Sequence, residues 1–195
     1  MEAIQFESRL IYKTKHNQVL KNIMTVMLGS FLLAVSAQIT LPIQPVPITL
    51  QSFAALFMGM AFGPKMGSKI VLAYLCEGVL GLPVFANFSW GLHVLLGPTG
   101  GYLLGFIPAA ILSGYLLQTG WARYRATIFF ATLFGTMALF LPGYLMLVKF
   151  VGFHNAYLLG IAPFYMVEAC KLFVFTIITP LFWRRKAIKN GNIKT

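Results

Sequence analysis

Six apolar stretches, separated by short polar or glycine-rich segments, occupy most of this sequence. The 195 residues are 58% hydrophobic and only 10% charged, whereas an ordinary soluble chain is about 25% charged. A charged group in hydrocarbon is costly unless it is paired or hydrated, so this shortage of charge indicates that lipid surrounds the chain. A helix that crosses a bilayer needs about 20 apolar residues, and the length accommodates six. The stretches lie at about 22–38, 48–63, 66–80, 99–118, 124–148 and 160–183.

The positions of lysine and arginine predict how these helices are oriented. If the N-terminus is cytoplasmic, the first two external loops, 39–47 and 81–98, contain no lysine or arginine, as the positive-inside pattern requires. Lys149, near the third external loop, and Lys171, within the sixth stretch, are the exceptions. We therefore predict an all-α integral membrane protein of the cell membrane, with six transmembrane helices and both termini cytoplasmic. The basic residues then assigned to the cytoplasm are Arg9, Lys13, Lys15, Lys21, Lys65, Lys69, Arg123, Arg125, Arg184, Arg185, Lys186, Lys189 and Lys194.

The chain is predicted to be a single membrane domain, because no internal repeat, linker or soluble segment interrupts it. Residues 1–21 would form a cytoplasmic tail, 22–183 the six-helix bundle and 184–195 a basic cytoplasmic tail. The net charge of +11 is not gathered on one polar face, so we expect no nucleic-acid partner. A cleaved secretory signal is an alternative for the first stretch, since Ala34-Val-Ser-Ala37 resembles a cleavage site, but the membranous chain that follows favours an uncleaved helix.

Two ionisable residues, Glu168 and Lys171, lie within the sixth apolar stretch. Residues three apart share one face of a helix, so the carboxylate and the ammonium are expected to lie together. An ionisable residue inside a membrane is by default a candidate for function. The structural alternative is an ion pair that neutralises itself and orients helix packing. Glu77, near the outer end of the third stretch, is a weaker case of the same kind.

The two long external loops carry neutral polar groups among apolar residues. The first, 38–51, contains three prolines that fix backbone angles and remove amide donors, and this favours a stiff lid over a binding site or a rigid connector. The second, 81–102, is aromatic and glycine-rich and is expected to fold onto the helices at the membrane interface. Asn87 is its main neutral hydrogen-bonding group, either as a turn residue or as a ligand contact. Its Gly97-Pro-Thr-Gly-Gly run lacks the following lysine of a phosphate-binding loop.

Small residues at helical spacing predict close packing. Ser30 and Ala34 would allow the first helix to approach another helix, of this chain or of a partner. Two glycine series have the same spacing: Gly59, Gly63 and Gly67, and Gly97, Gly101 and Gly105.

We expect no metal site. His93 and His154 have no second ligand at metal-binding spacing, and Cys76 and Cys170 lie inside apolar runs, where cysteine behaves as a small hydrophobe.

Four segments spread over most of the chain form a specific combination: Ala37-Gln-Ile…Pro45-Val-Pro-Ile-Thr-Leu-Gln51, Gly78…Gly81-Leu-Pro-Val-Phe-Ala86, Gly97-Pro-Thr-Gly-Gly-Tyr-Leu and Pro163-Phe…Lys171. In this order they resemble the BioY family, the biotin-binding S component of energy-coupling factor (ECF) transporters. The resemblance has one departure, because Val167 and Glu168 stand where the family usually has Gly-Asp before the last lysine. The carboxylate is kept on a side chain that is one methylene longer.

The resemblance implies a six-helix subunit that captures biotin from outside. It would deliver biotin together with an energy-coupling transmembrane subunit and two ATPases, so that ATP is used only by the partners and no cofactor is expected here. The small-residue face at Ser30 and Ala34 resembles the docking surface of such subunits.

Biotin's chemistry suggests roles for individual side chains. Glu168 would accept a hydrogen bond from a ureido N–H, and Lys171 or Asn87 would donate one to the ureido carbonyl. Three aromatic residues would cover the thiophane ring, and polar residues of the first loop or backbone amides would hold the carboxylate tail. The candidate ligand-binding residues are Gln44, Thr49, Gln51, Phe85, Asn87, Tyr102, Phe164, Glu168 and Lys171.

Three alternatives are open. The same architecture could carry another vitamin or a biotin precursor. An intramembrane hydrolase or acyltransferase would need a nucleophile and a base; Ser89 and His93 are spaced as neighbours on a helix, but no nucleophile motif surrounds them, so we predict that the chain is not an enzyme. A channel is disfavoured because a single polar cluster at the outer face predicts capture rather than a continuous pore.

Overall fold

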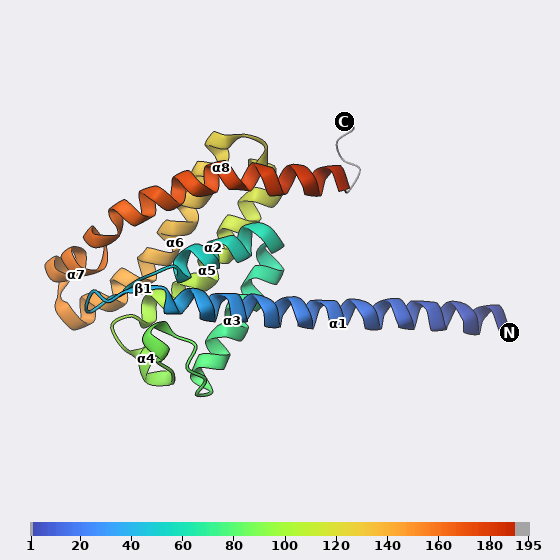
Figure 1. Ribbon diagram of the computed structural model, residues 1–195, viewed down its shortest axis with the longest axis horizontal. Helices are drawn as coiled ribbons and strands as arrows, with labels where there is room; N and C mark the ends of the chain where they lie inside the picture. Colours follow the sequence, from blue (N-terminus) through green and yellow to red (C-terminus); the bar gives the residue numbers. More distant parts are fainter. Residues whose placement is uncertain (1, 190–195) are drawn as a thin grey trace.

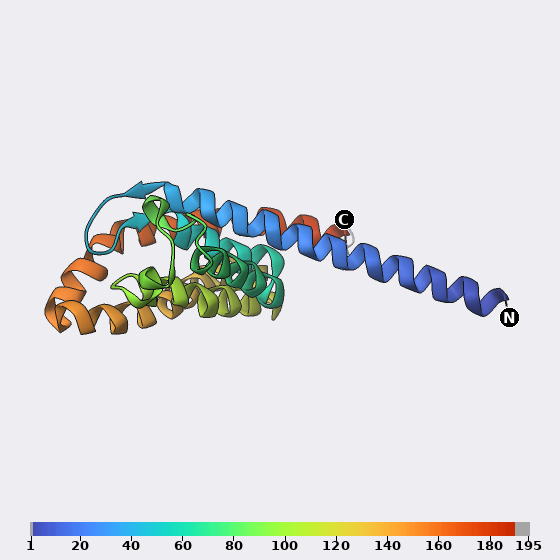
Figure 2. The same ribbon diagram turned by 90° about the horizontal axis from the view of Figure 1, so that it is seen from below.

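Helices make up most of the molecule. The computed structural model describes the backbone of residues 2–189 and the side chains of residues 17–181. In the view of Figure 2 the longer helices run roughly along the long axis of the molecule. The six longest are α1 (Glu2–Gln38), α2 (Gln51–Phe62), α3 (Pro64–Val79), α5 (Gly100–Gln118), α6 (Arg125–Val151) and α8 (Tyr165–Lys189).

Each predicted apolar stretch forms one of these helices, with ends that differ from the prediction by a few residues in most cases. The exception is α1, which runs without a break through the segment predicted as a tail, because residues 2–21 contain neither glycine nor proline. Most of the basic residues assigned to the two tails, including Arg9, Lys13 and those from Arg184 onward, lie outside the described side chains.

Length and composition support four crossings among the described residues. The segments that are long and apolar enough are Asn17–Gln38, Gly100–Gln118, Arg125–Val151 and Phe153–Leu181. Helix α2 is apolar but has only 12 residues, and 12 residues rise about 18 Å, well short of the roughly 30 Å of bilayer hydrocarbon. Helix α3, with 16 residues, is also short. The chain is therefore an all-helical protein with four candidate membrane spans.

A sharp turn joins α2 to α3. Gly63 lies between the helices with φ of 83°, a conformation that glycine adopts without strain. Pro64 occupies the first position of α3, where its missing N–H costs nothing. The two helices therefore fold back on each other side by side.

Helix α5 lies at the centre of the bundle, in contact with α2, α3 and α6. A Cβ added at Gly59 of α2 would lie 2.2 Å from the carbonyl oxygen of Ala110 in α5. One added at Gly105 of α5 would lie 2.4 Å from the carbonyl oxygen of Leu139 in α6. The close helix approach predicted from the glycine spacing is confirmed, and it brings the helix backbones into direct contact.

All the short elements except the one between α5 and α6 gather at one end of the molecule, which we call the loop end. Figure 1 shows β1, α4 and α7 on one side and the beginning of α1 and the end of α8 towards the other. The predicted proline-rich segment forms a two-stranded antiparallel hairpin in which Thr40 pairs with Thr49. The short elements of the chain are β1 (Thr40–Leu41), β2 (Ile48–Thr49), η1 (Ala86–Phe88), α4 (Leu92–Leu96), η2 (Trp121–Arg123), α7 (Phe153–Gly160) and η3 (Ala162–Phe164).

Candidate ligand-binding site

A cavity of about 260 Å³ lies at the loop end, between the first hairpin, the loop after α3 and the segment that leads into α5. This volume is slightly below the range of about 300–1,000 Å³ that is usual for small-molecule pockets. Half of the lining is apolar. The other half consists of neutral hydrogen-bonding residues: Thr49, Gln51, Asn87, Ser89 and Thr99. A concave wall that combines apolar residues with convergent neutral polar groups suits a small organic ligand.

Gln51, the first residue of α2, fixes one wall of the cavity. It is only 3% exposed, and its amide nitrogen donates to the hydroxyl of Tyr74 in α3. Tyr74 in turn donates to the carbonyl oxygen of Val84 at 3.0 Å, and Thr49 donates to Gln51 Oε1 at 3.4 Å. This chain of bonds ties α2, α3 and the following loop together, so Gln51 shapes the wall with groups that are already paired.

Asn87 projects from an unusual turn in the opposite wall. It has φ of 56° and ψ of 36°, and Phe88 after it also has a positive φ, of 54°. Asparagine accepts this left-handed conformation more readily than other side chains. The Asn87 side chain makes no hydrogen bond to any described residue and borders the cavity. Its amide is thus available to a ligand both as donor and as acceptor.

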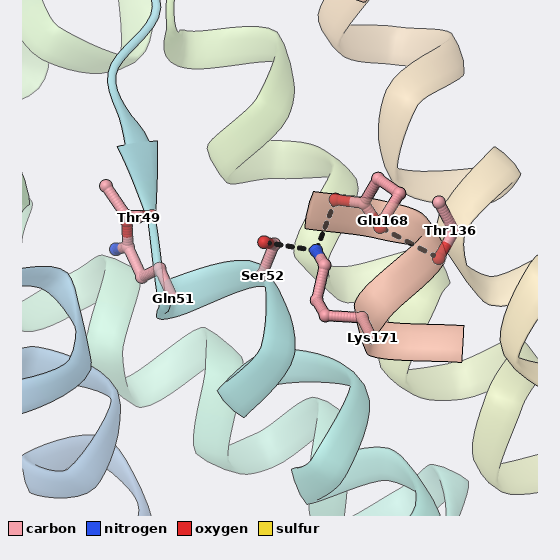
Figure 3. A network of polar contacts seen from close by, with 6 residues as sticks. All are labelled: Thr49, Gln51, Ser52, Thr136, Glu168 and Lys171. Carbon is pink, nitrogen blue, oxygen red and sulfur yellow. Dashed lines mark hydrogen bonds and ion pairs between the residues drawn. The ribbon is translucent and has the colours of Figure 1, made fainter. Parts of the chain in front are cut away.

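Glu168 and Lys171 form an ion pair, as their spacing in the sequence predicted. The two residues are 9% and 6% exposed. Lys171 Nζ also donates to Ser52 Oγ at 2.7 Å, and Thr136 donates to Glu168 Oε2 at 3.4 Å. Figure 3 shows this network: Lys171 reaches the first turn of α2, while Thr49 and Gln51 lie on the other side of that turn. The pair is therefore inside the bundle, next to the cavity wall.

Two of the aromatic residues predicted to cover a ligand pack on each other. The rings of Tyr102 and Phe164 are stacked with centroids 6.4 Å apart, and both rings contact Phe140 edge to face. The Tyr102 hydroxyl donates to the carbonyl oxygen of Gly160 at 2.9 Å. Neither Tyr102 nor Phe164 lines the cavity, so this cluster joins α5 and α6 to η3. Aromatic rings on neighbouring helices favour such stacked and edge-to-face contacts with one another.

Phe85, the third predicted aromatic, does line the cavity. Its ring is 1% exposed and packs edge to face on Tyr74 and against Gly78, where an added Cβ would lie 2.1 Å from the ring. The ring therefore anchors the loop to α3.

Gln44 lies elsewhere. It is exposed at the tip of the hairpin, beside Pro45, and does not border the cavity. It belongs to the bend between β1 and β2, outside both strands, so its predicted contact with a ligand stays a prediction.

The predicted docking pair on the first helix also requires correction. Ser30 is 1% exposed and donates to Glu77 Oε1 of α3 at 2.7 Å. Ala34 packs against the hydrophobic core. Ser30 therefore seats α1 on the rest of its own chain, and only Ala34 keeps part of its surface exposed.

Several residues of the site were missed. Ser52 and Thr136 complete the ion-pair network, and Tyr74 supports Gln51. A serine or threonine within an apolar membrane helix is a signal that could have pointed to the first two, since such hydroxyls often bond across helices.

These helices and this cavity define a helical membrane protein with a candidate site for a small molecule. A model described as the BioY family matches residues 9–188, and the chain belongs to this family.

Individual relatives agree with this membership. "Probable biotin transporter BioY" of Pyrococcus horikoshii is 40% identical over 158 residues, which cover 81% of this chain and 93% of the relative. "Biotin transporter BioY" of Thermotoga maritima is 38% identical over 150 residues, covering 75% and 86%.

A solved structure has the same fold. The crystal structure of the S-component for biotin from an ECF-type ABC transporter matches with a TM-score of 0.76 and 23% identity, over 86% of this chain and 93% of that chain. The resemblance predicted from the four sequence segments is confirmed. Membership of this transport family makes the chain a transport protein and not an enzyme.

Proposed function

We propose that this chain is the substrate-capture subunit of a biotin uptake transporter and that it binds biotin from outside in the cavity at the loop end. The observation that carries the proposal is the Asn87 amide, which makes no hydrogen bond to any described residue and borders a cavity lined by apolar and neutral polar residues in equal number. The names of the BioY relatives support biotin as the ligand.

The chemistry of biotin matches this lining. Its fused rings are apolar except for a ureido group with two N–H donors and one carbonyl. The Asn87 amide can satisfy both kinds of group at once, and the hydroxyls of Ser89 and Thr99 border the same space. Thr49, Gln51 or backbone amides would hold the carboxylate tail.

Glu168 and Lys171 would take part by exchanging partners. Glu168 would accept from a ureido N–H, and Lys171 would donate to the ureido carbonyl. Each would then give up a bond to a hydroxyl of the bundle, to Thr136 and Ser52 respectively. Such an exchange replaces one hydrogen bond with another and leaves neither charge unpaired, which keeps its cost low.

The chain would cross the plasma (inner) membrane six times, with both termini cytoplasmic and the loop end outside. The distribution of basic residues supports this orientation, as does the common direction of the beginning of α1 and the end of α8 (Figure 1).

The two ends of α3 offer a test of this orientation. Leu80, directly after the last residue of α3, is 83% exposed, and Lys65 lies in the first turn of α3, at the other end of the helix. In a cysteine-free background, Leu80→Cys should react with an impermeant maleimide in intact cells and Lys65→Cys only after permeabilisation. The reverse pattern would contradict the orientation.

Its partners would be an energy-coupling transmembrane subunit and two ATPases, and ATP would be consumed by the ATPases alone. The name of the fold relative, an S-component of an ECF-type ABC transporter, supports this assembly. Purification of a tagged chain from native membranes should retain the three subunits. A chain that purifies alone and still takes up biotin in vesicles would overturn the assembly.

The central test is binding of labelled biotin to the purified chain, with unlabelled competitors. Biotin should displace the label, and vitamins without a ureido ring should not. Stronger displacement by desthiobiotin would identify a precursor as the ligand. No binding of biotin by folded protein would reject the proposal.

A further inference from the structure

We propose that Gln38 is a positioning residue for the ligand: its side-chain amide holds the turn at residues 85–88 in the shape that presents Asn87 to the cavity. This inference rests on the proposed function, because it concerns how the same cavity recognises its ligand. Gln38 itself does not line the cavity, so it acts through the turn.

The contacts of Gln38 span this turn from end to end. Its Nε2 donates to the carbonyl oxygen of Phe85 at 3.1 Å, and its Oε1 accepts from the backbone N–H of Phe88 at 3.0 Å. One amide group thus pairs with both ends of a four-residue segment that has Asn87 in its middle. A further bond from Nε2 to the carbonyl oxygen of Ala34 at 3.3 Å ties the side chain back to α1, of which Gln38 is the last residue.

The turn needs such support because its backbone is strained. Asn87 and Phe88 both have a positive φ, of 56° and 54°, and successive left-handed residues persist only where the surroundings determine them. Phe88 is 64% exposed, so its ring contributes little to holding the turn. Within the turn, the backbone N–H of Phe85 donates to the carbonyl oxygen of Ser89 at 3.1 Å and that of Ser89 donates to the carbonyl oxygen of Ala86 at 3.2 Å, and Ser89 Oγ donates to the same Ala86 oxygen at 2.8 Å. None of these bonds involves the backbone N–H of Phe88, which donates to Gln38.

The direction of Asn87 follows from this arrangement. The ring of Phe85 is fixed against Gly78 and Tyr74, which anchors the start of the turn, and Gln38 fixes its end. With both ends fixed, the left-handed conformation of Asn87 sets the side chain towards the cavity that it borders. Without Gln38, the N–H of Phe88 loses its partner and the turn can relax to other conformations in which the Asn87 amide no longer faces the ligand.

The test is a double-mutant cycle on the purified full chain, with biotin affinity measured by titration calorimetry. Gln38→Ala and Asn87→Gly should each weaken binding about tenfold, the typical effect of one lost hydrogen bond to a buried partner. Asn87→Gly removes the side chain but suits the positive φ. Because Gln38 acts through Asn87, the double variant should bind no more weakly than Asn87→Gly alone. Gln18→Ala, the same substitution at an exposed glutamine of the same helix, should leave affinity unchanged.

A second readout monitors the turn directly. Hydrogen exchange of the peptide that contains Phe88 should speed up in Gln38→Ala and less so in Gln38→Glu, which keeps an acceptor for the Phe88 N–H. Unchanged affinity in Gln38→Ala, fully additive losses in the double variant, or unchanged exchange at Phe88 would each overturn the inference. If the wild-type chain does not bind biotin, the proposed function fails, whereas the exchange measurement still decides whether Gln38 holds the turn.

Discussion

Two polar regions lie on opposite sides of the first turn of α2, and they are built in contrasting ways. The cavity side is made by loops and carries only neutral groups, among them Asn87 with an unpaired amide. The other side is made by helices and carries Glu168 and Lys171, paired with each other and closed off by hydroxyls from Ser52 and Thr136.

The difference follows from the cost of burying each kind of group. Asn87 is exposed, so its amide costs little without a protein partner, whereas an unpaired charge in an apolar interior is expensive. Glu168 and Lys171 are therefore paired in the ligand-free protein, whereas the Asn87 amide is free to pair with a ligand. Substitutions on the helical side should first affect stability, and those on the loop side should first affect binding.

The largest effect is expected from breaking the ion pair. Lys171→Ala leaves the Glu168 carboxylate buried without a cation and should destabilise the chain by about 3–5 kcal/mol, measured as unfolding of the purified protein in detergent. Lys171→Met combined with Glu168→Leu should recover most of the loss, since the charge is then absent, yet biotin binding should stay weak. If Lys171→Ala is as stable as the wild type, the ion pair is hydrated in the folded protein. Normal biotin binding by the double variant would show that the pair does not contact the ligand.

A smaller and different effect is expected at Asn87. Asn87→Gly should weaken biotin binding about tenfold and change the free energy of unfolding by less than about 0.5 kcal/mol. Asn87→Ala is the matched control: it should lose the same affinity but also about 1 kcal/mol of stability, because alanine is strained at positive φ. Equal stability of the two variants would mean that the left-handed turn is absent from the folded protein.

The smallest effect is expected at Ser52, on the border between the regions. Ser52→Ala removes an acceptor from Lys171 but leaves the ion pair, so a loss of about 1 kcal/mol of stability is expected. Ser68→Ala, which removes an exposed hydroxyl bonded within its own helix, should have no measurable effect. A loss at Ser52 as large as that of Lys171→Ala would contradict the separation of the two regions.

The sequence predicted the helical side better than the loop side. Apolar runs located the helices, and a spacing of three residues placed Glu168 beside Lys171, because both follow from helical periodicity. No period governs the loops. The direction of the Gln44 side chain depends on a hairpin, and that of the Asn87 side chain depends on a left-handed turn. The packing of the Tyr102 ring depends on which helices lie next to each other. These outcomes are set by contacts between segments far apart in the chain.

The backbone contacts at Gly59 and Gly105 have a consequence for how a ligand enters. At these two glycines and at Gly67, the backbones of α2, α3, α5 and α6 touch without intervening side chains, so sliding one helix past another would force backbone atoms into collision there. We expect these four helices to move as one rigid body. Admission and release of a ligand would then be a hinge motion of the peripheral hairpin and of the segment after α3, which can swing while the interior keeps its geometry.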